Sequence, residues 1–332
     1  MADPSKPEDI PIGSVIDGYI VEAKLGAGGM GAIYKVREPG TEELKALKVI
    51  ATSAKNNDPE DGDNTKLAEE RFQREAQVLA KLTRLEHPNI IAIHRYARFG
   101  GTQYIVMPLF SGVDLRRWVK TNPSLDRVLG VARQLAAAVG YAHSQGVLHR
   151  DLKLSNALIN ADDKVKLIDF GLAREASIEA HQLTQAGTAS GTWAYLAPEY
   201  VASEMDHDIL TEMWATGVML YHLVTHRLPF SVGPGGDPVK LWKVIAEAKF
   251  VAVRELRPDC SIEFAALVHD LLQKDRARRI QNAAALAQRL SLIQSAQAPG
   301  VVPSAPLAVP VPEPTRPARQ PAPKPAVPEA TS

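Results

Sequence analysis

The chain has 332 residues, of which 45% are hydrophobic, a composition that suits one large domain or two smaller ones with a full core. Lys and Arg together number 38, as do Asp and Glu, so the global charge favours neither nucleic acid nor an anionic membrane as the principal partner. The only cysteine, Cys260, excludes an internal disulfide, is typical of a reducing compartment and is expected to serve in packing. The acidic amino terminus lacks the apolar core of a signal peptide, and no run of about 18 apolar residues predicts a membrane span. These observations predict a soluble, cytoplasmic protein.

The first predicted elements are two strands around a glycine-rich turn, after a leader over 1–18 that we expect to be disordered. The alternation of apolar and polar residues predicts a strand from Tyr19 to Leu25, and strand-like residues return after the turn. Between the strands, Gly26, Gly28 and Gly31 would let the backbone approach a polyphosphate closely. A strand on both sides argues against a dinucleotide-binding fold, in which a helix follows the glycines. On its own, the turn could equally be an ordinary glycine-rich hairpin.

A lysine within an apolar strand marks the next element. The segment 44–50 is predicted to be a strand, and Lys48 lies inside its apolar run. A buried ammonium needs an anionic partner, either an acidic side chain or a ligand phosphate, unless the lysine faces outward. After a polar insert, an amphipathic helix is predicted over 67–85, and Glu75 lies near its middle. An ion pair between Lys48 and Glu75 would satisfy the lysine, although Glu75 could also be a solvated helix position.

Helices dominate the second half of the chain. Two more strands are predicted over 90–99 and 104–109, and helical periodicity begins near Leu115. The clearest helix spans 125–144 and stops at Gly146, a good carboxyl-terminal cap. Further helices are predicted over 211–225, 238–248, 262–273 and 282–294.

A pair of charged motifs follows the helix over 125–144. The first is His149-Arg150-Asp151-Leu152-Lys153-Leu154-Ser155-Asn156, and the second is Asp169-Phe170-Gly171. Two acids, an amide and a lysine at this spacing can hold two metal ions and a proton acceptor around one phosphoryl group. Both motifs in this order, each preceded by an apolar run, rarely arise together by chance.

Two later segments are predicted to lack regular structure. The loop over 172–196 is rich in Thr, Ser, Gly and Ala, and loops of this length inside a compact domain are usually functional or mobile. Beyond position 298 the chain contains 11 of its 24 prolines, which predicts a disordered or polyproline II-like tail.

From about Tyr19 to Leu292 the chain resembles a protein kinase catalytic domain, specifically the bacterial eukaryotic-like serine/threonine kinases. The order and spacing of its motifs agree with that family throughout: Gly26-x-Gly28-x-x-Gly31-x-Ile33, Ala46-Leu47-Lys48, Glu75, His87-Pro88-Asn89-Ile90, His149-Arg150-Asp151, Lys153, Asn156, Asp169-Phe170-Gly171, Gly191-Thr192 and Ala197-Pro198-Glu199. The resemblance implies an α+β, two-lobed protein kinase fold over 19–292. A small, mainly antiparallel β N-lobe with one key helix (19–110) would precede a larger, mainly helical C-lobe (111–292) and a disordered Pro-rich tail (293–332).

The resemblance also implies how ATP and Mg²⁺ are held. Lys48 would contact the α- and β-phosphates while Glu75 holds the lysine. Asn156 and Asp169 would bind magnesium.

Transfer itself would depend on the first motif. Asp151 would orient the substrate hydroxyl and accept its proton, and Lys153 would stabilise charge on the γ-phosphate. His149 would be mainly a packing residue, stacked with Leu79 and Phe170.

The resemblance assigns the remaining nucleotide contacts to both lobes. Besides the three glycines, the residues expected around adenine are Leu25, Ile33, Ala46, Met107, Pro108, Phe110 and Leu158. Pro108 replaces the acidic residue usual in the family, but it keeps the carbonyl that meets the adenine amino group. Asp114 is placed either to reach the ribose or to cap a helix.

Two departures from the family lie in the C-lobe. Glu212-Met213-Trp214 stands where the family usually has Asp-x-Trp, and the extra methylene puts in doubt the anchor that this acid provides for the catalytic loop. Near the end, the segment from Asp275 lacks the usual proline but keeps Arg279, the expected partner of Glu199.

Substrate class and regulation follow from the resemblance. Lys153 and Thr192 are typical of kinases that phosphorylate serine and threonine. Arg150, beside the catalytic Asp, could pair with a phosphate on the 172–196 loop and order it. Thr184 and Thr188 are the best acceptors for such autophosphorylation.

The sequence therefore predicts a serine/threonine protein kinase that uses ATP and Mg²⁺. Its expected partners are protein substrates, a second copy for trans-autophosphorylation and a polyproline-binding protein for the tail, although an extended spacer is the favoured interpretation of the tail. A pseudokinase scaffold would be expected to lose Lys48, Asp151 or Asp169, and all three are present. A small-molecule phosphotransferase is disfavoured by Ala197-Pro198-Glu199 and the long acceptor loop.

Overall fold

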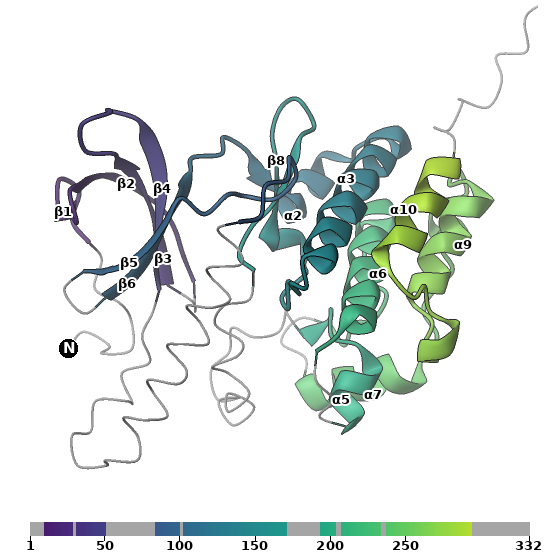
Figure 1. The fold of residues 1–332 in the computed structure, drawn as a ribbon. Coiled ribbons are helices and arrows are strands. Elements are labelled where there is room, and N and C mark those ends of the chain that lie inside the picture. The colour runs from purple at the N-terminus through teal and green to yellow at the C-terminus, as the bar shows by residue number, and fades with distance from the viewer. Residues whose placement is uncertain are drawn as a thin grey trace, which may run out of the picture. The chain divides into compact units, whose positions relative to one another are not determined.

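The computed structural model describes residues 10–28, 31–50, 84–99, 102–170, 193–203, 207–233 and 237–293. Within these residues, a six-stranded antiparallel sheet is followed along the chain by a largely helical region (Figure 1). The two-lobed α+β fold expected from the sequence is thereby confirmed. The N-lobe helix predicted over 67–85 lies outside the described residues except for its last two positions, and the tail beyond Ile293 lies outside them entirely.

The N-lobe sheet has the strand order β1-β2-β3-β4-β6-β5. Its strands are β1 (Val15–Ile16), β2 (Tyr19–Gly28), β3 (Gly31–Arg37), β4 (Leu44–Ile50), β5 (Arg95–Phe99) and β6 (Thr102–Pro108). The predicted glycine-rich hairpin is confirmed, because β2 and β3 pair up to Gly28 opposite Gly31. Regular structure begins earlier than expected, since β1 pairs with the start of β2 and buries Ile16.

The two faces of this sheet carry different side chains. Because side chains alternate along a strand, Tyr34, Leu47 and Val106 share one fully buried face. On β4 the same alternation puts Lys48 on the opposite face together with Ala46. The predicted strand over 44–50 matches β4, and its pattern therefore decides which face receives the lysine.

The strand predicted over 90–99 is only partly present. Strand β5 begins at Arg95, whereas Ile90 forms a parallel bridge with Leu167 and Ile91 donates a backbone hydrogen bond to the same residue at 2.9 Å. The apolar residues at the start of this segment are thus buried against a strand about 75 positions later in the chain. Periodicity alone does not reveal that partner.

A second, three-stranded sheet was not predicted. It has the order β7-β8-β9, formed by Val113–Asp114, Ala157–Ile159 and Val165–Leu167. Strands of two or three residues are too short to show a period in the sequence. This small sheet flanks the segment that contains the charged motifs.

The helices of the C-lobe follow the predicted pattern closely. They are α2 (Leu115–Trp118), α3 (Leu125–Ser144), α5 (Pro198–Ser203), α6 (Ile209–Thr225), α7 (Pro238–Glu247), α8 (Val253–Leu256), α9 (Ile262–Leu271) and α10 (Ala283–Leu292). The bounds of α3 equal the predicted ones; Ser124 caps its start, and Gly146 follows its end with φ +67°. The other predicted helices differ by one to three residues at their ends, as terminal turns commonly do.

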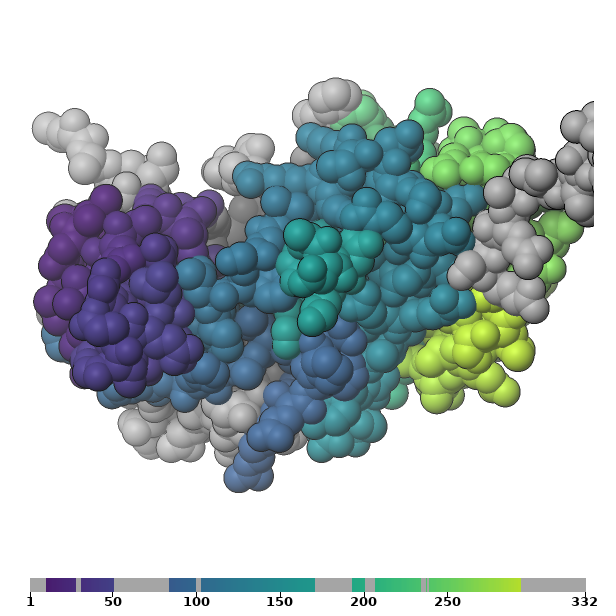
Figure 2. Space-filling model, turned by 90° about the horizontal axis from the view of Figure 1, so that it is seen from above, coloured from purple at the N-terminus to yellow at the C-terminus, as the bar shows by residue number. Residues whose placement is uncertain are grey.

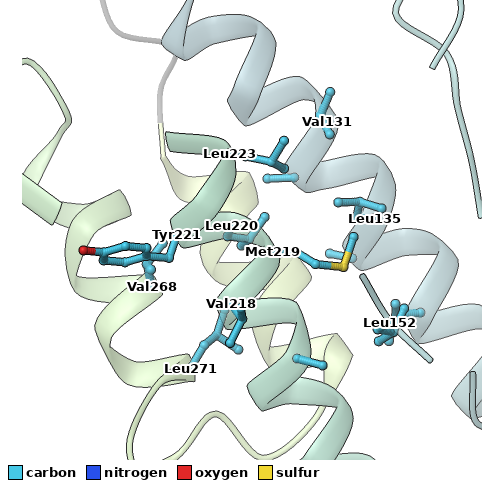
Figure 3. Packing of buried hydrophobic residues seen from close by; sticks show 14 of the residues in the cluster. Val131, Leu135, Leu152, Val218, Met219, Leu220, Tyr221, Leu223, Val268 and Leu271 are labelled. Atoms are coloured by element: carbon cyan, nitrogen blue, oxygen red, sulfur yellow. The ribbon is translucent and has the colours of Figure 1, made fainter. Parts of the chain in front are cut away.

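The C-lobe core is built around α6. Figure 3 shows Val218, Met219 and Leu223 of α6 between side chains of α3 and α9. At Gly217 an added Cβ would lie 2.7 Å from Leu271 Cβ, so the close approach of α6 and α9 depends on this glycine. Cys260 is buried in the same cluster, and burial raises the pKa of its thiol to about 11, which agrees with the packing role expected for it.

The surface of the two lobes is seen from above in Figure 2. The strands at the start of the chain and helix α10 near its end lie on opposite sides of the described residues in this view. Every helix of the described ranges is too short or too polar to cross a lipid bilayer.

Candidate active site

Buried apolar residues fix the backbone of the catalytic loop, defined here as residues 147–156. Val147, Leu152 and Leu154 are each at most 4% exposed and belong to the C-lobe core, where Figure 3 places Leu152 near α3 and α6. Burying each leucine contributes about 2 kcal/mol. Because these apolar residues alternate with the charged ones, the core determines where the charged side chains stand.

Asp151 is the centre of a compact polar cluster. The side-chain nitrogen of Asn156 donates to the Asp151 carbonyl at 2.9 Å and to Asp151 Oδ2 at 2.8 Å. Lys153 Nζ lies 2.7 Å from the same Oδ2. The three residues that the first motif supplies are thus brought together, with Asp151 only 4% exposed.

His149 supports this cluster through hydrogen bonds as well as packing. Burial lowers the pKa of His149 and keeps the ring neutral. A single neutral tautomer satisfies both ring nitrogens: Nε2 donates to the Ile168 carbonyl at 3.0 Å, and Nδ1 accepts from the Asp151 amide at 3.3 Å. The expected stack with Phe170 is present, with ring centroids 4.5 Å apart, whereas Leu79 lies outside the described residues.

Lys48 finds its anionic partner in the second motif. Its Nζ lies 2.7 Å from Asp169 Oδ1, with the lysine side chain 12% exposed and the aspartate 20%. Asp169 adopts φ +57°, a left-handed conformation that turns the chain at this point. The expected pairing of Lys48 with Glu75 stays a prediction, because Glu75 lies outside the described residues.

Asn156 and Asp169 fit a magnesium ion by their chemistry and their place. The Ile168 amide donates to the Asn156 carbonyl at 2.9 Å, which brings the residue before Asp169 against Asn156. The Asn156 amide nitrogen is engaged with Asp151, so its oxygen is the atom left for a cation. An amide oxygen and a carboxylate are the hard donors that Mg²⁺ prefers, and Mg²⁺ commonly takes its other ligands from phosphates and water.

The adenine-pocket residues are only partly assembled. Ile33, Ala46, Met107 and Phe110 belong to one apolar cluster on the lysine-bearing face of the sheet. Within the sheet, Ala46 pairs with Met107, and Gly26 pairs with Ile33.

The other predicted nucleotide contacts stand apart from this cluster. Leu25 is 52% exposed on β2, and Leu158 lies in β8, paired with Lys166. Pro108 ends β6 opposite Lys45.

Of the two roles considered for Asp114, the structure contains the helix cap. Asp114 is the N-cap of α2 and accepts a hydrogen bond from the Arg117 amide at 2.9 Å. Its carboxylate also lies 3.8 Å from Arg116 Nε and 3.6 Å from Arg117 Nε. A contact with ribose remains a prediction.

Glu212 reaches the catalytic loop despite replacing the shorter aspartate. Its Oε1 accepts from the Arg150 amide at 2.6 Å, and Arg150 has φ +63°, a conformation that is rare for a side chain of this size. His143 Nε2 lies 2.7 Å from Oε2, and His207 Nε2 lies 3.5 Å from Oε1. The anchor that the sequence put in doubt is therefore present.

Burial alone would raise the pKa of Glu212, but hydrogen bonds from His143 and His207 lower it to about 2. The two histidines were missed at the sequence level, because nothing in the pattern links residues 69 positions apart. His207, five positions before Glu212, could have been suspected only once that glutamate was known to be buried.

The second ion pair expected in the C-lobe is confirmed. Arg279 donates to both carboxylate oxygens of Glu199, at 2.6 and 2.9 Å. The predicted phosphoacceptors Thr184 and Thr188 lie outside the described residues.

Comparison with known proteins agrees with this geometry. The sequence pattern described as "Protein kinase domain" matches residues 19–290. The chain belongs to the protein kinase family. Serine/threonine-protein kinase PknJ of Mycobacterium tuberculosis is 33% identical over 304 residues, which cover 90% of this chain and 49% of that protein. Probable serine/threonine-protein kinase PknB of Lactococcus lactis is 34% identical over 225 residues, 67% of this chain and 34% of that one.

The kinase domain thus resembles bacterial serine/threonine kinases, as the motifs indicated, but the chain spans about half or less of the length of these curated relatives. Among solved structures, the PknI kinase domain of Mycobacterium tuberculosis aligns with TM-score 0.62 and 25% identity, covering 85% of this chain and 98% of that one. Rad53 residues 1–466, in complex with AMP-PNP, aligns with TM-score 0.64 and 29% identity, covering 83% and 66%.

Proposed function

We propose that this protein is a serine/threonine protein kinase that transfers the γ-phosphate of ATP to hydroxyl groups of proteins. The observation that carries the proposal is the cluster in which Lys153 and Asn156 both contact Asp151, together with the Lys48–Asp169 ion pair. The names of the curated relatives support serine and threonine as the acceptors.

On the donor side, Lys48 is the cation for the nucleotide phosphates. It lies on the same face of the sheet as the apolar cluster of Ala46 and Met107, which suits an adenine ring. Asn156 and Asp169 would hold Mg²⁺, and the bound ion supplies positive charge that offsets the charge of the transferring phosphoryl group. The AMP-PNP complex of Rad53 supports nucleotide binding at such a site.

On the acceptor side, Asp151 is the proton acceptor. Its contacts with Lys153 and Asn156 both use Oδ2, so Oδ1 is the oxygen available for a substrate hydroxyl. Lys153, held beside it, carries positive charge towards the γ-phosphate as the bond breaks. Since phosphoryl transfer proceeds through a loose, highly charged transition state, positioning and electrostatics suffice and no covalent nucleophile is required.

We also propose activation by autophosphorylation at Thr184 or Thr188, in trans between two copies, with Arg150 as the partner of the new phosphate. The position of Arg150 next to Asp151 supports a link between loop phosphate and catalysis. A binding partner for the Pro-rich tail and a cytoplasmic location stay predictions.

The proposal is tested by incubating the protein with ATP, with and without Mg²⁺, and mapping phosphate by tryptic mass spectrometry. We expect Mg²⁺-dependent phosphate on threonine or serine, including Thr184 or Thr188, and none with Lys48→Met. Loop phosphate found only at other residues would contradict the proposed acceptors. Nucleotide binding without any transfer to itself or to a general protein substrate would favour a pseudokinase instead.

A further inference from the structure

The Glu212 carboxylate that anchors the catalytic loop needs a positive partner. Its side chain is only 1% exposed, and its low pKa means that it carries a full negative charge. A buried charge is stable only where it is paired and hydrogen-bonded. The Arg150 amide, 2.6 Å from Oε1, is a neutral donor and supplies no charge.

His143 is suited to act as a second neutral donor. Its Nε2 lies 2.7 Å from Glu212 Oε2, whereas its Nδ1 is buried and has no hydrogen-bond partner among the residues that the structure describes. A neutral ring that donates through Nε2 leaves only a bare acceptor at Nδ1, but a protonated ring would bury an unpaired N–H. His149 is also kept neutral by burial.

His207 is the remaining histidine at this carboxylate. Its Nε2 lies 3.5 Å from Glu212 Oε1, the oxygen that also holds the Arg150 amide. This distance is long for a hydrogen bond but suits an ion pair with a protonated ring. The side chain is 17% exposed and lines a pocket beside the catalytic loop, so solvent protons can reach it.

The other groups around His207 leave this role to it. The neighbouring acid, Asp208, caps α6 and pairs with Arg276, so its charge is already matched. The Tyr200 ring meets the His207 ring edge-on at 5.9 Å. The titratable or charged residues that line the pocket with His207 are Arg150, Asp151, Tyr195 and Tyr200.

We propose that His207 is a positioning residue of the kinase reaction: its protonated ring balances the Glu212 carboxylate, which in turn holds Arg150 and so places Asp151. The proposal rests on the kinase function proposed above. It goes beyond that function by making the geometry of the proton acceptor depend on a half-buried histidine outside the catalytic motifs.

The test compares His207→Phe, which keeps a ring against Tyr200 but removes the charge, in wild-type and Glu212→Gln backgrounds. In the wild type we expect kcat to fall about five-fold, the equivalent of about 1 kcal/mol for a partly exposed ion pair, with KM for ATP unchanged. The loss should be larger at about pH 6 than at about pH 8.5, because His207 is charged mainly at the lower pH. In the Glu212→Gln background the same substitution should change kcat less than about two-fold, since no charge remains to be balanced. His94→Phe, at an exposed histidine of the N-lobe, is the matched control.

Hydrogen exchange of the peptide that contains Arg150 provides a readout independent of activity. We expect His207→Phe to speed exchange in this peptide, and His94→Phe to leave it unchanged. Equal exchange in both variants, or a loss of kcat that is the same at both pH values and in both backgrounds, would overturn the positioning role and leave only a packing contact. A wild type that transfers no phosphate would refute the proposed function, while the exchange result would still decide whether His207 holds the loop.

Discussion

Replacing Arg279 by methionine should destabilise the C-lobe severely. The Arg279 side chain is fully buried and donates four hydrogen bonds, two to the Glu199 carboxylate and two to the carbonyls of Gln273 and Leu210. Its guanidinium carbon also lies 5.1 Å from the centre of the Trp214 ring.

Methionine keeps much of the packing volume but leaves two buried carbonyls without this donor and Glu199 without its two-pronged partner. Glu199 retains Arg276 at 3.1 Å, which limits the loss. The expected cost is about 3 kcal/mol, towards the lower end for breaking a buried pair. The midpoint of thermal unfolding should fall by about 6–10 °C.

Urea unfolding followed by far-UV circular dichroism measures this difference. The matched control is Arg278→Met, one position away on an exposed side chain, which should change stability by less than about 0.5 kcal/mol. Arg279→Lys keeps the charge but not the planar fork, so it should fall between the two. The reasoning would be refuted if Arg279→Met were no less stable than Arg278→Met.

Two further predictions concern packing and acid stability. Gly217→Ala should cost about 1–3 kcal/mol, because the new Cβ would meet Leu271 Cβ at 2.7 Å, whereas Gly130→Ala on α3, where a Cβ has open space, should stabilise the protein by about 0.5–1 kcal/mol; equal effects in urea titrations would contradict both assignments. The pKa of Glu212 is lowered from 4.5 to about 2, so its stabilising contribution is complete above about pH 4.5 and is lost as the pH falls towards 2. This contribution is at most about 3 kcal/mol, and Glu212→Gln should therefore flatten the loss of stability between pH 5 and about pH 2.5; an unchanged acid limb would argue against an ionised Glu212.

The sequence predicted the parts of the fold that repeat a period over many residues. The helix over 125–144 and the strand over 44–50 have the predicted bounds, because a long apolar face and clear capping residues decide them locally. Sheet β7-β8-β9 was missed because its strands have two or three residues. The start of the segment after Asn89 was assigned to the wrong partner, since its pairing with Leu167 depends on tertiary contacts.

The candidate site shows the same division. The motif residues Asp151, Lys153 and Asn156 come from a single short loop, so their meeting could be expected from the sequence. The contacts of Glu212 with His143 and His207 join α3, α6 and the segment before α6, and such long-range contacts leave no local pattern. The doubt about Glu212 arose from comparing side-chain length alone, whereas the position of its backbone on α6 decides its reach.

The central claim, that Asp151 accepts the proton in an ATP-dependent transfer, is tested most directly by comparing wild type with Asp151→Asn. The substitution is isosteric and leaves the backbone carbonyl that accepts from Asn156. Both proteins should bind Mg²⁺-ATP, seen as the same rise in the thermal unfolding midpoint. The rate of phosphate transfer should fall at least about 100-fold in the variant, as expected on removing a general base. Equal transfer rates in the two proteins, at equal nucleotide binding, would contradict the account.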